Sequence, residues 1–239
     1  MKRTNNTVFI SGGSAGIGLE IAKLFSANGN KVIINGRDQH RLDLALQQLE
    51  GASAIQGDLS VESERIRIAA KLSADYPDVN VIINNAGAAY TYSLTESGKA
   101  YEYAKDEITT NYLSIIHFTE LLLPVLKTRE SAVVNVTSIV GLFPRTGVAT
   151  YAASKAALHF YTQSLRDSLS DTNVHVFELL PPLVNTEFSA AIGGANGIPP
   201  KEVAEELLSA FENNQYDVPV GQTKVVHQVL QQALGSLKK

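Results

Sequence analysis

Tyr151 and Lys155 stand at positions i and i+4, and Ser138 follows an apolar run at residues 132–137. A tyrosine hydroxyl has an ordinary pKa of about 10, so it exchanges protons poorly at neutral pH unless a nearby cation favours the phenolate. A lysine at i+4 places such a cation on the same face of a helix. The spacing therefore predicts an acid-base pair, with the hydroxyl of Ser138 facing the same reacting oxygen.

Spacing alone does not identify the reactive tyrosine, because Tyr101 and Lys105 have the same separation. Only Tyr151 has a serine upstream at the end of a strand-like run. We therefore interpret Tyr151 as the chemical residue and Tyr101 as an amphipathic surface residue.

The elements that must position these residues alternate between strands and helices. Short runs rich in β-branched residues predict strands at 7–10, 31–35, 79–84, 131–137 and 174–180, with a weaker one at 53–56. Apolar stripes of helical period lie at 17–28, 42–49, 64–74, 107–127 and 151–169. This alternation predicts one α/β domain over residues 1–239, a Rossmann-type doubly wound parallel sheet of six to seven strands with helices on both faces.

Two stretches without a regular pattern, residues 88–99 and 187–200, each follow the carboxyl end of a predicted strand. Ligands bind beyond that edge in open α/β sheets, so we expect both stretches at the rim of a site, with a substrate loop at about 186–200. Pro219 suits only an edge strand. A C-terminal helix is expected at about 223–237.

A glycine-rich turn follows the first predicted strand, where residues 11–18 read Ser-Gly-Gly-Ser-Ala-Gly-Ile-Gly. Glycines let the backbone turn sharply and approach a pyrophosphate, whose charge the free N–H groups of a helix N-terminus stabilise. An ordinary tight turn is the alternative interpretation. The position of the turn as the first loop of a βαβ series favours dinucleotide binding.

The glycine spacing, Gly12-x-x-x-Gly16-x-Gly18, is one residue longer at its front than the common dinucleotide fingerprint. Together with Asn-Asn-Ala-Gly at 84–87, Asn111, Ser138 and the Tyr151/Lys155 pair, it makes the chain resemble the short-chain dehydrogenase/reductases from about residue 8 to residue 186. The double proline at 181–182 and residues 4–20 are similar to bacterial short-chain oxidoreductases named after D-alanyl-lipoteichoic-acid operons.

The resemblance implies roles for further residues. Asn111 would hold a water that links Lys155 to solvent, and Lys155 would also hold the nicotinamide ribose. The implied cofactor-binding residues are Gly12, Ser14, Gly16, Ile17 and Gly18 at the pyrophosphate, Asp58 and Leu59 at the adenine, Asn85, Ala86 and Gly87 at the adenosine ribose, and Val184 and Thr186 at the nicotinamide amide. Each has a structural alternative: Asp58 as a helix N-cap, the Asn84-Asn85 pair as a strand cap, and Asn111 as a residue that satisfies a helix kink.

Coenzyme choice is decided at the end of the second predicted strand, which reads Asn35-Gly36-Arg37-Asp38. An acidic side chain at a strand tip binds the ribose hydroxyls and repels a 2′-phosphate, whereas an arginine attracts the phosphate. Gly36 takes the acidic position and Arg37 follows, so NADP(H) is predicted over NAD(H). The alternative makes Asp38 the ribose ligand or leaves Arg37 merely solvated.

The predicted reaction is reversible hydride transfer between a nicotinamide and a carbonyl/alcohol pair, with Tyr151 as the acid and Ser138 as a hydrogen-bond donor to the same oxygen. A dinucleotide-binding sensor without turnover is the alternative. Side chains that could wall an apolar pocket for a small or medium uncharged carbonyl compound are Leu142, Phe143, Pro144, Leu183, Phe188, Tyr90 and Tyr92, although all are equally good core residues.

The composition of the 239-residue chain argues against several classes of partner. A net charge of −4 offers no basic field for nucleic acid or an anionic membrane, and no apolar run approaches the ~20 residues of a membrane span. The chain has no cysteine, and its five histidines are scattered without metal-ligand spacing, so a cytoplasmic protein with no metal is expected. We also expect a homo-oligomer, a dimer through the long helices around Asn111 and residues 151–169 rather than a tetramer.

Overall fold

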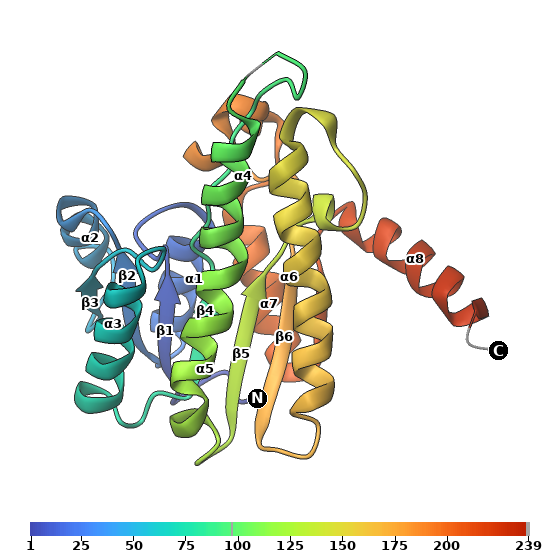
Figure 1. Ribbon diagram of the computed structural model, residues 1–239. Coiled ribbons are helices and arrows are strands. Elements are labelled where there is room, and N and C mark those ends of the chain that lie inside the picture. Colours follow the sequence, from blue (N-terminus) through green and yellow to red (C-terminus); the bar gives the residue numbers. More distant parts are fainter. Residues whose placement is uncertain (97, 238–239) are drawn as a thin grey trace.

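Runs of β-branched and aromatic residues form the centre of the molecule, as the alternating pattern requires. The computed structural model describes residues 1–96 and 98–237, in which a parallel sheet has the strand order β3-β2-β1-β4-β5-β6-β7 (Figure 1). The strands are β1 (Thr7–Ser11), β2 (Lys31–Gly36), β3 (Ser53–Gln56), β4 (Val81–Asn84), β5 (Ser131–Val136), β6 (Val174–Leu180) and β7 (Asp217–Pro219). The predicted Rossmann-type α/β fold is confirmed.

Helices cover both faces of this sheet. They are α1 (Gly16–Ala27), α2 (Gln39–Leu46), α3 (Glu62–Asp75), α4 (Ala100–Ile108), α5 (Ser114–Leu126), α6 (Ala149–Ser168), α7 (Pro200–Asn213) and α8 (Thr223–Leu237). In β1, Val8 and Ile10 belong to the core under α1, α2 and α7, while Phe9 between them belongs to the core under α3 and α5. Successive strand residues point to opposite faces, so each strand contributes to two cores.

The prediction of one continuous helix over residues 107–127 is wrong. A π-helical segment, Thr109–Leu113, separates α4 from α5 and carries Asn111. π-Helical turns inside helices commonly occur at functional sites. The interruption moves Asn111 out of the regular helical register, toward the carboxyl end of β4.

The two stretches expected at the rim of the site differ in how much regular secondary structure they contain. Residues 88–96 and 98–99 form no helix or strand, and Ser97 of this predicted stretch lies outside the described residues. The stretch at 187–200 is more regular than predicted, because 3-10 helices span Glu187–Ile192 and Gly194–Asn196. A bridge between Val184 and Ile198 closes this segment at its base, and α7 begins at Pro200.

The C-terminal elements agree with their predictions. Strand β7 pairs with β6 at the edge of the described sheet, and Pro219 lies opposite Leu180 there. Helix α8 then extends away from the body of the molecule (Figure 1). Within residues 1–96 and 98–237, no helix is long and apolar enough to cross a membrane.

Candidate active site

The site lies where the strand order reverses. Strand β1 has β2 on one side and β4 on the other, and ligands of doubly wound sheets bind in the crevice at this switch point. The carboxyl ends of β1, β4, β5 and β6 carry the glycine turn, the 84–87 segment, Ser138 and the double proline respectively. Segments far apart in the sequence therefore meet at one edge.

The turn after β1 is built for close backbone approach. Gly12 and Gly16 have φ angles of 64° and 53°, in the left-handed region that a residue with a Cβ atom rarely adopts. The hydroxyl of Ser11 accepts hydrogen bonds from the backbone N–H groups of Asn85 and Ala86, at 2.9 and 3.0 Å. The Asn85 side chain donates to the carbonyl of Ser11, at 2.9 Å, so the end of β4 holds the turn in place.

The turn fits a pyrophosphate. Ala15 is the N-cap of α1 and provides no side-chain cap, so the first N–H groups of this helix are left for an anion. A Cβ atom added to Gly16 would lie 3.2 Å from a methyl of Thr186. Ile17 and Gly18 lie in the first turn of α1. The side chain of Thr186 lies against this turn at Gly16.

At the tip of β2, Gly36 lies against Ser14 and Leu42, and Arg37 follows it. A Cβ atom on Gly36 would lie 3.2 Å from the Oγ of Ser14, so the glycine leaves space beside that hydroxyl. Arg37 has 79% of its side chain exposed and its guanidinium lies 3.7 Å from Asp58. Asp38 is the N-cap of α2 and its Oδ1 accepts a hydrogen bond from Arg41 N, at 3.0 Å.

The two residues predicted at the adenine have different environments. Asp58 Oδ1 accepts a hydrogen bond from Ser60 N, at 2.8 Å, so it holds the turn before α3, whose N-cap is Val61. Its alternative interpretation as a helix N-cap is therefore wrong. The side chain of Leu59 is buried in the core under α3, and its carbonyl accepts from Arg65.

Ser138, Tyr151 and Lys155 converge at the ends of β5 and α6. Ser138 is the N-cap of a 3-10 turn, Ile139–Gly141, and its hydroxyl is close enough to the phenol of Tyr151 to lower the pKa of that group. Lys155 is buried one turn further along α6, with its Nζ 5.8 Å from the ring centroid of Tyr151. The side chain of Tyr101, in contrast, is 80% exposed, which agrees with its interpretation as a surface residue.

The protein's own groups do not acidify Tyr151. Burial raises the pKa of Tyr151 to about 12; the hydrogen bond from Ser138 opposes this rise, and the charge of Glu107 adds to it. Burial also lowers the pKa of Lys155 to about 8. The acidification of the phenol is predicted from Lys155 together with the charge of an oxidised nicotinamide, and it stays a prediction.

Asn111 connects three elements of the site. Its side-chain amide donates to the carbonyl of Ala88 and to the hydroxyl of Ser154, at 2.8 and 2.9 Å, and its Oδ1 accepts from Ala88 N, at 2.8 Å. A Cβ atom on Gly87 would lie 3.1 Å from Asn111 Oδ1 and 3.9 Å from Lys155 Nζ. The printed bonds of the Asn111 side chain thus join the segment after β4 to α6, and its Oδ1 faces the same glycine as Lys155 Nζ.

The segment after β6 lies beside these residues. The carbonyl of Pro181 accepts a hydrogen bond from Ile139 N, at 2.9 Å, which joins the double proline to the Ser138 turn. Val184 is buried, and the side chains of Thr186 and Ser189 form a capping box at the start of the following 3-10 helix. The ring of Phe188 lies 6.1 Å from that of Tyr151, so it faces the reactive position.

The predicted pocket tyrosines are anchored by polar contacts. Tyr90 stacks on Tyr103, and its hydroxyl donates to Asp106, at 2.6 Å. The hydroxyl of Tyr92 bonds to that of Thr150, at 2.6 Å, directly beside Tyr151. Tyr92 is therefore bonded to the residue that immediately precedes Tyr151 in the chain.

Sequence reasoning missed three polar residues near the site, of which Glu107 and Glu178 are fully buried and His159 is partly buried. Glu107 lies one turn before Asn111 and accepts from Tyr90 N, at 2.8 Å; burial raises its pKa. His159 pairs with Glu178 at 2.8 Å. A glutamate within the apolar run of β6 was the available signal. Among residues 1–96 and 98–237, no group of three His, Cys, Asp or Glu side chains could hold a metal ion.

Comparison with known proteins places this geometry in a family. The model for "short chain dehydrogenase" matches residues 6–197. The uncharacterized oxidoreductase DltE of Bacillus subtilis (strain 168) is 39% identical over 207 residues, which are 86% of this chain and 82% of that protein. The NADP-dependent 3-hydroxy acid dehydrogenase YdfG of Salmonella typhi is 33% identical over 187 residues, 77% of this chain and 75% of that protein.

Solved structures agree in fold. A short-chain dehydrogenase from Sphingobium yanoikuyae, in complex with NADPH, has a TM-score of 0.87 and 26% identity, over 98% of this chain and 95% of that one. The likeness to DltE confirms the predicted subgroup. Because the family model covers the glycine turn and the Ser138, Tyr151 and Lys155 positions alike, the chain belongs to the short chain dehydrogenase family of oxidoreductases.

Proposed function

We propose that this protein is an NADP(H)-dependent oxidoreductase that transfers a hydride between nicotinamide and a carbonyl/alcohol substrate. The observation that carries the proposal is the convergence of three side chains: Ser138 at the end of β5 lowers the pKa of the Tyr151 phenol, and the buried Lys155 lies one turn away on α6 with its Nζ 5.8 Å from the Tyr151 ring. A protein that only binds a dinucleotide needs no such proton donor.

In the reduction direction, Tyr151 gives its proton to the substrate oxygen while Ser138 donates a hydrogen bond to the same atom. Bound NADP(H) supplies the hydride and, in its oxidised form, a positive charge. Lys155 places its ammonium near the phenol and favours the phenolate that forms. Asn111 bonds to the Ala88 backbone, and its Oδ1 and Lys155 Nζ both face Gly87, which supports its predicted role in holding a water that resupplies the proton.

The residues at the coenzyme crevice support a dinucleotide with a 2′-phosphate. Gly12, Gly16 and the uncapped start of α1 suit the pyrophosphate. At the tip of β2, Gly36 leaves space and Arg37 offers an exposed guanidinium, while the carboxylate of Asp38 is engaged at the start of α2. YdfG is named as NADP-dependent, and the Sphingobium yanoikuyae structure contains NADPH. The remaining proposed contacts are Ser14, Ile17, Gly18, Asp58, Leu59, Asn85, Ala86, Gly87, Val184 and Thr186.

Apolar side chains around Tyr151 favour an uncharged carbonyl compound of small or medium size. Phe143 and Phe188 are exposed near the reactive end of the crevice, and Phe188 contacts the Tyr151 side. Apolar walls with few polar groups are typical of small-molecule sites. We propose that the segment from Thr186 to Pro199 closes over this substrate.

The test is a panel of aldehydes, ketones and diketones, each assayed for oxidation of NADPH and of NADH by the purified protein. We expect turnover with at least one class and a preference for NADPH. Tight coenzyme binding with no turnover across the panel would favour the alternative, a dinucleotide-binding sensor.

The exposed apolar side chains on the long helices bear on the oligomeric state of the protein. We propose a homodimer through the helical stretch around Asn111 and through α6, because Leu113 and Phe160 expose apolar surface there and the rings of Tyr112 and Tyr161 meet edge to face at 6.1 Å. Paired helix faces of this kind lose their apolar exposure in a dimer.

A cytoplasmic location is proposed from the lack of cysteine in the sequence.

A further inference from the structure

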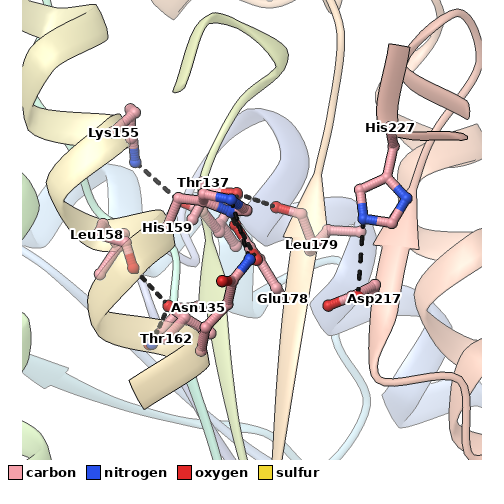
Figure 2. Close-up of polar contacts among 12 residues, drawn as sticks. Asn135, Thr137, Lys155, Leu158, His159, Thr162, Glu178, Leu179, Asp217 and His227 are labelled. Atoms are coloured by element: carbon pink, nitrogen blue, oxygen red, sulfur yellow. Dashed lines mark hydrogen bonds and ion pairs between the residues drawn. The ribbon is translucent and has the colours of Figure 1, made fainter. Parts of the chain in front are cut away.

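Glu178 is a fully buried carboxylate in the middle of β6, outside the proposed catalytic group. Its two oxygens lie 2.8 and 3.0 Å from Nδ1 of His159, and Oε1 accepts a hydrogen bond from the hydroxyl of Thr137, at 2.7 Å (Figure 2). A buried ionised carboxylate is strongly unfavourable unless it is paired and hydrogen-bonded. One side chain of β6 is therefore bound to both the end of β5 and the middle of α6.

Each partner of Glu178 adjoins a proposed catalytic residue. Thr137 immediately precedes Ser138 in the chain. His159 follows Lys155 by one turn of α6, as Lys155 follows Tyr151, so the three side chains share a helix face. The Nζ of Lys155 also donates to the carbonyl of Val136, at 2.7 Å, next to Thr137 (Figure 2).

The strand that carries Glu178 leads directly to the double proline. Its next residue, Leu179, accepts a hydrogen bond from Thr137 N at 2.9 Å. Pro181 accepts one from Ile139 N at 2.9 Å, beyond Ser138. The Ser138 turn, the Tyr151 helix and the segment proposed to contact nicotinamide are thus joined around one carboxylate.

The charges around His159 favour its protonated form. Burial lowers the pKa of His159, but the hydrogen bond and charge of Glu178 outweigh it and raise the pKa above the ordinary 6.5. Asp217 of β7 also raises the pKa, and Arg166 of α6, which pairs with Asp217 at 2.8 Å, lowers it. Lys155 is a further cation of α6, one turn before His159, and His227 of α8 lies 3.6 Å from Asp217.

We infer that Glu178 and His159 are positioning residues for the proposed hydride transfer, in which the Glu178 carboxylate aligns β5 and α6 so that Ser138 and Tyr151 face the same substrate oxygen. The inference rests on the proposed function and deepens it. Charge-assisted hydrogen bonds are directional and short, so they restrict the rotation of α6 more tightly than apolar contact does. Misplacement of reacting groups by about 1 Å can lower a rate by about 10²-fold.

The test is a double-mutant cycle on kcat with Thr137→Val, His159→Gln and Glu178→Gln. Each single variant is expected to lower kcat roughly tenfold, with little change in NADPH affinity. Adding Thr137→Val or His159→Gln to Glu178→Gln should lower kcat no further, because residues that act through one group are non-additive. His227→Gln is the matched control, a second histidine-carboxylate pair whose removal should leave kcat unchanged.

An independent readout is the NMR titration of the imidazole of His159. Its pKa should fall in Glu178→Gln and remain raised in Thr137→Val. Unchanged kcat in folded Thr137→Val and His159→Gln, or fully additive losses in the double variants, would overturn the inference. If Glu178→Gln does not fold, a Thr137→Val/His159→Gln double variant with additive losses overturns it as well. A wild type inactive on every carbonyl compound would instead refute the proposed function, which separates the two failures.

Discussion

The Nζ of Lys155 donates a hydrogen bond to the carbonyl oxygen of Val136, at 2.7 Å, from a position with almost no solvent exposure. This contact fixes the ammonium between the end of β5 and the phenol of Tyr151, yet one carbonyl compensates poorly for the water that the charge loses on burial. The site therefore contains a charge that is unfavourable for folding and that the proposed proton transfer would use.

Replacing Tyr151 with phenylalanine should abolish turnover while leaving NADPH affinity nearly unchanged. The variant loses the only hydroxyl proposed to donate the proton, a contribution of roughly 10²–10⁴-fold, but keeps the ring. Steady-state reduction and NADPH fluorescence titration measure the two quantities. Tyr101→Phe is the control, since its spacing to Lys105 is the same and its side chain is exposed. Substantial activity in Tyr151→Phe would show that another group is the acid.

Replacing Lys155 with methionine should stabilise the fold at neutral pH while it destroys activity. Burial lowers the pKa of Lys155 to about 8, and a lowering of this size corresponds to roughly 3 kcal/mol at most. Urea denaturation at pH 7 should show Lys155→Met more stable than the wild type, with Lys105→Met unchanged as the surface control. Equal or lower stability of Lys155→Met would mean that the buried ammonium is better compensated than its contacts indicate.

The same shift predicts how the Lys155 contribution changes with pH. Between about pH 8 and the unfolded pKa of 10.5, the folded protein has lost this proton while the unfolded chain still binds it. The unfolded state then binds more protons, so the free energy of unfolding from this group rises with pH across that window. The stability difference between Lys155→Met and the wild type should therefore shrink from pH 7 to pH 10.

Replacing Arg37 with alanine should weaken NADPH binding about tenfold, equivalent to ~1.4 kcal/mol, and leave NADH binding unaffected. The guanidinium is exposed at the tip of β2 and is proposed to pair with the 2′-phosphate. Titration of the protein with each coenzyme checks this. Arg129→Ala is the control, because Arg129 lies between α5 and the start of β5, at the amino ends of the strands, whereas Arg37 lies at a carboxyl end. Equal losses for NADPH and NADH would point to a role in the adenosine pocket unrelated to the phosphate.

Replacing Phe160 with aspartate should dissociate the proposed dimer. Its side chain is 68% exposed on α6 and would be buried against a second copy, where an unpaired carboxylate is strongly unfavourable. Light scattering after size exclusion measures the mass. Leu234→Asp on α8, whose side chain is also half exposed, is the comparison. Dissociation by Leu234→Asp and not by Phe160→Asp would move the interface to α8.

Much of the fold was predictable because local patterns carried it. Alternating strands and helices predicted a parallel sheet, and Pro219 predicted an edge strand, since its missing N–H excludes a central one. The glycine turn and the order of Asn111, Ser138, Tyr151 and Lys155 indicated the family. The break at Thr109–Leu113 was not visible in the apolar period, because it depends on hydrogen bonds from Asn111 to Ala88 and Ser154, which are far away in the sequence.

The sequence by itself determined which residue types were available for the chemistry, their order along the chain and the elements that carry them. Tertiary structure alone decided that burial raises the pKa of Tyr151 and lowers that of Lys155, and that Glu178 joins Thr137 to His159. The physical reason is that propensity and periodicity act over a few neighbouring residues. Burial and hydrogen bonding depend instead on what the folded sheet brings together from distant parts of the chain.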